Sequence, residues 1–270
     1  MMRKITTILL LALVLNSCGE YQKVLKSDDY NYKYTKAVAY YEAEDFNRAM
    51  PLFNELSTVL RGTAKMQEVS YYFAYCHYST SDNLMAAYLF RNYTQNYPNG
   101  KHTQECAYMT AYCYYLEAPN YSLDATNNYK AIKELQAFVD RFPNSDRIEE
   151  CNVLLDELRA VLSKKAFENA KQYFTTENYK SAIIALENVL IDFPSYKNRE
   201  EVHFLIVKSS YSLAVNSISA KVNTRLKSTL DAYTQFKDNY PNSVFLIDLE
   251  NTYNKTNKTL TELKEKKDEI

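Results

Sequence analysis

The stretch Asn178-Tyr-Lys-Ser-Ala-Ile-Ile-Ala-Leu-Glu-Asn-Val-Leu-Ile-Asp-Phe-Pro194 decides how this chain of 270 residues folds. Ala182, Leu186 and Val189 recur at three- and four-residue spacing, so they share one face of a helix. Pro194 ends that helix, because proline disfavours helical backbone in the residue before it. The stretch therefore predicts an amphipathic helix with a small residue near its start and a firm stop.

The same arrangement recurs along the chain. An alanine stands twelve residues before each of Pro98, Pro143 and Pro194, and bulky residues stand eight and five before each proline. In the first unit Arg61 takes the place of the proline. The small residues in this register are Ala49, Ala86, Ala131 and Ala182, and the bulky ones are Phe53, Leu56, Phe90, Tyr93, Leu135, Phe138, Leu186 and Val189. In three of the four units a further alanine stands twelve residues before the first (Ala37, Ala74 and Ala170). Paired small residues let two helices of a hairpin approach closely, and the bulky positions fill the space to the next pair.

This register resembles the tetratricopeptide repeat, with Tyr40 and Tyr173 at its aromatic position. We therefore predict an all-α fold, an α-solenoid of about five tetratricopeptide-like helix pairs. The third unit carries an insertion, 118–127, and the fourth opens with a long helical run from about Asp146 to Thr176. Ser243 is expected to begin a C-terminal capping helix that covers the last apolar face.

The first residues have the features of an exported lipoprotein. Arg3 and Lys4 precede an apolar run, 8–15, that is too short to be a comfortable membrane span. Leu15-Asn-Ser-Cys18 resembles a bacterial lipobox, which implies cleavage before Cys18 and acylation of its thiol and freed amine. An ordinary secretory signal with a chance cysteine is the alternative. We expect anchoring to the outer membrane through lipid, with the protein facing the periplasm.

Four segments follow from these observations. We predict a lipoprotein signal peptide (1–17), a lipid anchor and polar tether (18–31) with order starting near Tyr32, N-terminal repeats (32–143), and C-terminal repeats with the capping helix (144–270).

The composition of the chain argues against two classes of function, nucleic-acid binding and phosphate binding by a Gly-rich loop. A formal charge of -1 lacks the basic surplus of a general nucleic-acid binder, and only 3 glycines argue against a Gly-rich phosphate loop. The chain has 26 tyrosines and no tryptophan. Tyrosine packs its ring while keeping its hydroxyl wet, which suits helix packing first and protein-binding grooves second.

No catalytic constellation is recognisable, so we expect no enzyme activity, no metal and no cofactor. His77, His102 and His203 are isolated from one another in the sequence. His102 and Cys106 are one helical turn apart, but no second close pair completes a tetrahedral metal site. The cysteines beyond the lipobox are expected to be small buried residues, although a disulfide between adjacent helices stays open for Cys76 and Cys106 (the full set is Cys76, Cys106, Cys113 and Cys151).

One family shares the order of these features. The turn Phe142-Pro-Asn-Ser145 is followed by a long helix, a hairpin from Ala170 to Ala182, and the stop Asp192-Phe-Pro194. This order, behind a lipobox, resembles the outer-membrane protein assembly factor BamD family. Arg61-Gly62 departs from the family, in which an aromatic residue and a proline precede the glycine.

The resemblance implies a scaffold of the β-barrel assembly machinery. Its N-terminal repeats would bind unfolded outer-membrane β-barrel proteins, and its C-terminal repeats would dock the barrel-forming subunit beside other components of the machinery. The candidate substrate contacts are Tyr40, Arg61, Tyr72 and Tyr75, and the candidate partner contacts are Glu177, Asn178 and Tyr179. A general periplasmic tetratricopeptide lipoprotein for envelope division or secretion is the alternative. A SusD-like glycan-binding lipoprotein is disfavoured by the short chain and the absence of tryptophan.

Overall fold

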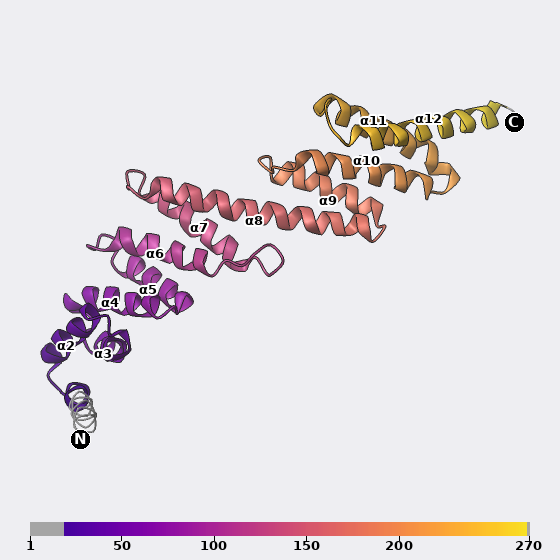
Figure 1. The fold of residues 1–270 in the computed structure, drawn as a ribbon. Coiled ribbons are helices and arrows are strands. Elements are labelled where there is room, and N and C mark those ends of the chain that lie inside the picture. The colour runs from indigo at the N-terminus through magenta and orange to yellow at the C-terminus, as the bar shows by residue number, and fades with distance from the viewer. Residues whose placement is uncertain (1–18, 269–270) are drawn as a thin grey trace, which may run out of the picture. The chain divides into compact units, whose positions relative to one another are not determined.

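The computed structural model describes residues 19–268, and these residues are helical and contain no β-strand. The helices, labelled in Figure 1, are α2 (Tyr30–Glu42), α3 (Phe46–Val59), α4 (Lys65–Ser79), α5 (Asn83–Asn96), α6 (Thr103–Leu116), α7 (Thr126–Arg141), α8 (Ile148–Thr175), α9 (Tyr179–Asp192), α10 (Arg199–Val215), α11 (Ser219–Asn239) and α12 (Leu246–Asp268). Within this range they form five helix pairs, from α2–α3 to α10–α11, followed by α12. The predicted all-α fold of tetratricopeptide-like pairs is confirmed.

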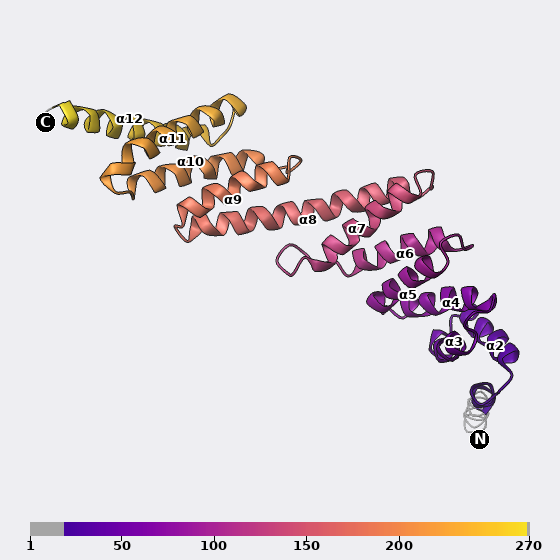
Figure 2. The same ribbon diagram turned by 180° about the vertical axis from the view of Figure 1, so that it is seen from behind.

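The chain divides into two compact units. Unit 1 comprises the chain up to Pro119 together with Asp124–Leu158, and unit 2 comprises Asn120–Leu123 together with the chain from Arg159 onward. The sequence placed a boundary at 143/144, ahead of the long helix. The two units instead divide inside α8, because the first half of this helix packs with α7 and its second half packs with α9. Helix α8 itself is unbroken in both views (Figures 1 and 2).

The predicted repeat register forms the core of both units. Ala49, Ala86 and Ala131 have no exposed surface, and neither have the bulky residues four positions after them. Small side chains at the crossing points let the paired helices approach, and the rings and leucines interdigitate with the next hairpin. The fifth pair keeps the register with Thr229, Tyr233 and Phe236, which are all buried.

Three hairpin turns share one backbone conformation. Glu44, Ser81 and Glu177 lie at φ of 57°, 62° and 60° between the two helices of their pairs. The residue after each donates its backbone N–H to the helix five residues earlier, as Asn178 does to the carbonyl of Tyr173 at 2.8 Å. Such bonds satisfy carbonyl groups left free at the end of a helix.

The segment before Tyr32 differs from the predicted tether. Residues 19–25 are helical, and Val24 is fully buried against the first hairpin. The Nζ atom of Lys33 donates to the carbonyl of Leu25 at 3.1 Å and pairs with Glu55 at 2.6 Å. The apolar face of this segment was missed because polar residues separate its few members over less than two helical turns.

Unit 2 continues the same packing. Leu186 and Val189 of α9 contact Phe167 and Ala170 of α8, and α10 packs between α9 and α11. These three helices follow one another in both views (Figures 1 and 2).

Helix α12 covers the end of unit 2, as the sequence predicted. It contacts α10 and α11 and buries Leu249, while Phe245 just before it stacks on Phe204 with ring centres 4.4 Å apart. The helix begins at Leu246, so Ser243 does not start it as predicted; its hydroxyl instead accepts the backbone N–H of Phe245 at 3.0 Å in the turn before the helix. A terminal repeat needs such a cover for its apolar face.

The insertion in the third pair has a defined anchor. Residues 117–125 join α6 to α7, and Asn120–Leu123 pack with unit 2. The Nζ atom of Lys165 donates to the carbonyls of Tyr121 at 3.1 Å and Leu123 at 2.7 Å.

Candidate protein-binding surface

Tyrosines recur at the same positions of successive first helices in unit 1. Helix α4 carries Tyr71, Tyr75 and Tyr78 at i, i+4 and i+7, and the corresponding residues of α6 are again tyrosines. We define the tyrosine band as the seven partly exposed tyrosines of α2, α4 and α6 whose rings contact one another in series: Tyr41, Tyr71, Tyr72, Tyr75, Tyr78, Tyr112 and Tyr115. Residues three and four apart share a helical face, so each helix contributes a row of rings.

The rings of the band form a chain of contacts. Tyr41 of α2 lies 4.8 Å from Tyr72 of α4, and Tyr71 lies 4.8 Å from Tyr75. Along α4, Tyr75 reaches Tyr78 at 6.1 Å, and Tyr78 crosses to Tyr112 of α6 at 6.5 Å. Tilted and edge-on pairs at these separations are favourable arrangements for aromatic rings. The band is therefore a contiguous surface over three helices.

Carboxylates from the next first helix receive the hydroxyls. Tyr75 donates to Glu105 at 2.7 Å, and Tyr115 donates to Glu157 at 2.6 Å. The bond to Glu157, together with burial, raises the pKa of Tyr115 to about 12, and burial with the Glu105 bond raises the pKa of Tyr75. Both phenols therefore stay protonated and remain donors at neutral pH.

A buried tyrosine and an arginine lie beneath the band. Tyr108 donates to Glu150 at 2.7 Å, and the guanidinium of Arg147 lies 4.1 Å from the centre of its ring. Arg147 also pairs with Glu105 at 3.1 Å. Since Glu105 accepts from Tyr75 as well, this network joins α4, α6 and the start of α8 within unit 1.

The arrangement can bind a polypeptide without chemistry. Half-exposed rings offer apolar area at low cost in conformational entropy, and carboxylates at their edges offer acceptors for backbone or basic side-chain donors. Helical-repeat surfaces bind segments of other proteins in this way.

The four predicted substrate contacts have different surroundings. Tyr72 and Tyr75 belong to the band, and both contact Tyr71. Tyr40 instead packs edge-on against Tyr21 of the 19–25 segment at 5.6 Å. Arg61 is exposed in the turn between α3 and α4. The structure therefore brings two of the four together.

Several band residues were missed from the sequence, namely Tyr71, Tyr78, Tyr112 and Tyr115. The signal that could have found them is the i, i+4, i+7 triplet of tyrosines that occurs in one first helix and again in the next.

The predicted partner contacts lie at the turn between α8 and α9. Glu177 and Asn178 are exposed, and Tyr179 is partly buried with its ring 6.0 Å from Phe174. They are neighbours in the chain and present a polar edge of unit 2.

The cysteines and His102 form neither a disulfide nor a metal site among the described residues. Cys18 lies outside the described residues. Cys76, Cys106, Cys113 and Cys151 are buried and unpaired, so the disulfide left open from the sequence does not form in this structure. Burial raises the pKa of the Cys76 thiol to about 12, which keeps it protonated and unreactive.

His102 stacks on Tyr71 at 3.9 Å between ring centres, with Glu68 3.2 Å from its Nε2 atom. Across the described residues, no three His, Cys, Asp or Glu side chains gather as metal ligands.

Helix pairs in one register, with rings lining their first helices, define a helical-repeat protein of the tetratricopeptide type. The family of outer membrane lipoproteins known as YfiO matches residues 26–198 and 164–265, and the chain belongs to this family. Between residues 19 and 268, no helix is both long and apolar enough to cross a membrane.

The TPR2AB-domain:pHSP90 complex of yeast Sti1 is similar at 15% identity and a TM-score of 0.40, over 84% of this chain and 98% of that chain. No curated protein matches the chain. The fold assignment rests on the helix pairs themselves.

Proposed function

We propose that the protein is a scaffold of the β-barrel assembly machinery, anchored to the outer membrane by lipid on Cys18 and facing the periplasm. In this role it holds unfolded outer-membrane β-barrel proteins beside the barrel-forming subunit and promotes their folding and insertion. Membership of an outer membrane lipoprotein family supports the location, and the tyrosine band is the observation that carries the binding role.

The chemistry of an unfolded barrel strand suits the band. Such strands alternate apolar and polar side chains and carry aromatic residues near both ends of the span. An extended segment therefore presents a row of rings and aliphatic groups on one side. The rings of Tyr71, Tyr78 and Tyr112 are positioned to stack on that row, and Glu105 lies at its edge to accept donors.

The remaining candidates have separate proposed roles. Arg61 is exposed at the turn after α3 and offers a cation for a carboxylate on the bound segment. Tyr40 supports the 19–25 segment, and its role is to hold the start of the mature chain against the first hairpin. The turn at Glu177, Asn178 and Tyr179 is proposed to contact the barrel-forming subunit through polar groups on unit 2.

Purification of the lipidated protein from membranes tests the proposal. A C-terminal affinity tag avoids the acylated end, and mild detergent keeps membrane partners bound. The barrel-forming subunit should co-purify in a stoichiometric amount, and unfolded barrel proteins should be captured after brief crosslinking. Recovery of cell-wall, secretion or glycan-uptake proteins without that subunit would support the alternative scaffold and contradict this proposal.

A further inference from the structure

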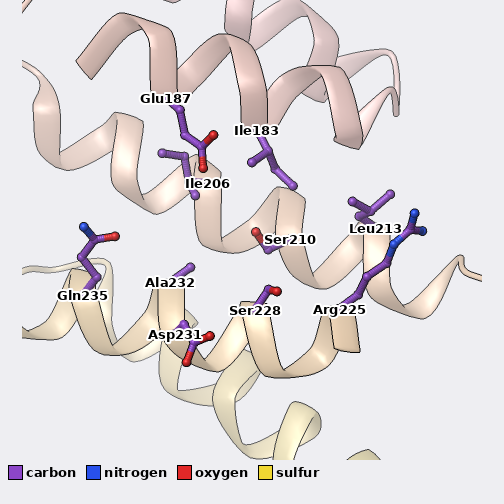
Figure 3. A pocket seen from close by; sticks show the side chains of 10 residues that line it. All are labelled: Ile183, Glu187, Ile206, Ser210, Leu213, Arg225, Ser228, Asp231, Ala232 and Gln235. Carbon is purple, nitrogen blue, oxygen red and sulfur yellow. The ribbon is translucent and has the colours of Figure 1, made fainter. Parts of the chain in front are cut away.

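A groove opens in unit 2 between α9 and α11, with α10 as its floor (Figure 3). Its volume is about 600 Å³, within the size range of sites that hold several side chains. Ile183 and Glu187 line it from α9, Ser210 lies on the floor, and Ser228 and Asp231 line it from α11 (Figure 3).

The equivalent location in unit 1, between α5 and α7 with α6 as its floor, is closed by side chains. In register, Tyr114 of α6 takes the place of Ser210, Arg91 of α5 that of Glu187, and Lys130 of α7 that of Ser228. The cationic groups of Arg91 and Lys130 lie 5.4 Å and 5.3 Å from the centre of the Tyr114 ring.

An ion pair between α5 and α7 completes the closure in unit 1. Arg91 donates to Glu134 of α7 at 2.6 Å, so the two outer helices are bridged over the ring. Tyr114 is consequently only 8% exposed. The aligned positions on either side match in burial, as Cys106 and Val202 do, which supports the register.

Every member of this closure is replaced in the corresponding helices of unit 2, α9, α10 and α11. The ring becomes a serine at Ser210, the bridging arginine becomes Glu187, and its partner position becomes Ala232. The groove therefore exists because the side chains that would fill it are absent from unit 2.

The replacements also reverse the charge. Glu187 and Asp231 line the groove, and within the described part of the chain neither forms an ion pair that neutralises it. The groove's cation, Arg225, donates to the hydroxyl of Ser217 at the end of α10. Carboxylates in a partly enclosed groove attract a basic side chain more strongly than carboxylates on an open surface do.

We propose that this groove binds a segment of a partner protein that presents an aromatic side chain beside an arginine or lysine. The ring enters over Ser210, between Ile183 and Ala232, and the cation pairs with Glu187 or Asp231. The incoming side chains restore the ring and cation that α5, α6 and α7 supply in unit 1. This inference stands on the groove alone and does not depend on the proposed assembly role.

Peptide binding to the full mature protein in detergent tests the inference. The probe is a fluorescein-labelled peptide with Arg-Tyr-Lys between Gly-Ser flanks, and the comparison peptides carry Glu-Tyr-Glu or Arg-Ala-Lys. Fluorescence anisotropy should show the first peptide binding at least about tenfold more tightly than either comparison. Equal affinity for the three peptides, or no binding of the first up to about 1 mM, would overturn the proposal.

A closing variant copies the side chains of the closed location in unit 1 into the groove of unit 2. Glu187→Arg with Ser210→Tyr and Ser228→Lys should weaken the first peptide by at least about tenfold. The control, Thr261→Lys with Glu262→Arg, makes the same change in net charge at exposed positions of α12 and should bind like the wild type. Equal binding by the closing variant and the wild type would contradict the site.

An isosteric variant guards against misfolding of the closing variant. Glu187→Gln with Asp231→Asn removes both charges without changing shape, and it should lose the preference for Arg-Tyr-Lys over Glu-Tyr-Glu. Retention of that preference would overturn the role of the two carboxylates. Analytical sedimentation tests whether a second copy of this chain occupies the groove instead. A wild-type dimer that the closing variant abolishes would place this chain itself in the groove and would refute a different partner protein.

Discussion

The guanidinium of Arg147 lies 4.1 Å from the centre of the Tyr108 ring and pairs with Glu105 at 3.1 Å. One side chain at the start of α8 thus supports both the buried tyrosine below the band and the carboxylate that receives Tyr75. The geometry of the exposed rings depends on this support, because Glu105 holds Tyr75 only while its own position is fixed.

Removal of this arginine should loosen the band. Arg147→Ala loses a cation–π contact and a half-exposed ion pair, so the free energy of unfolding should fall by about 1–2 kcal/mol. Arg147→Lys keeps the charge but loses the planar stacking, and its loss should be intermediate. Urea unfolding measures both. Arg61→Ala, in an exposed turn, is the control and should change stability by less than about 0.5 kcal/mol. Equal losses at the two arginines would contradict the network.

The left-handed turn residues offer a stabilising change. Glu44 has a φ of 57°, which strains a residue with a Cβ atom but not glycine. Glu44→Gly should therefore raise the free energy of unfolding by about 0.5 kcal/mol, after the extra flexibility of glycine in the unfolded chain is subtracted. Thermal melting is the measurement. The control Glu42→Gly falls within α2 and should lower stability, and a gain there would refute the explanation.

His203 should contribute to the pH dependence of stability. Burial, together with nearby Arg199, lowers the pKa of His203 below 6.5 in the folded chain. The unfolded chain then binds the proton first as the pH falls, so stability is lost below the unfolded pKa. Between about pH 7.5 and about pH 5.5, His203→Gln should lose less unfolding free energy than the wild type, by up to about 1 kcal/mol. Equal losses in urea unfolding would show that burial does not disfavour the charged imidazole.

Substitution of Cys18 tests the proposed lipid anchor. Cys18→Ala should move the chain from the membrane fraction to the soluble fraction, because the acyl chains are proposed to be attached through this residue. Cys76→Ala, at a buried position in α4, should leave the chain with the membrane. Membrane retention of the Cys18→Ala variant would show that the chain is held without acylation.

The sequence predicted the parts of the fold that follow from spacing. The positions of Ala86, Ala131 and Ala182 predicted where the helices cross, because close packing tolerates only small residues there. All three are fully buried. Burial of Val24 was not predictable, since a segment of less than two turns has no usable periodicity.

The surfaces were harder to predict than the core. Tyr72 and Tyr75 were predicted as substrate contacts, and both belong to the tyrosine band. The band as a whole depends on contacts between helices, such as that of Tyr78 with Tyr112, which sequence spacing alone does not specify. The groove was not predictable from the sequence because it results from a missing side chain. Ser210 becomes informative only when it is aligned with Tyr114 and the aligned helices are seen to pack alike.

Site-specific photo-crosslinking in cells tests the central claim, that the tyrosine band receives unfolded barrel proteins. Benzoylphenylalanine would replace Tyr78 or Tyr112 of the band, and Tyr88 or Tyr129 as controls, which are 56% and 60% exposed on the second helices α5 and α7. The account predicts crosslinks to newly exported outer-membrane β-barrel proteins from the band positions and few from the more exposed controls. Crosslinks from the controls at equal or greater yield, or none from the band, would contradict it.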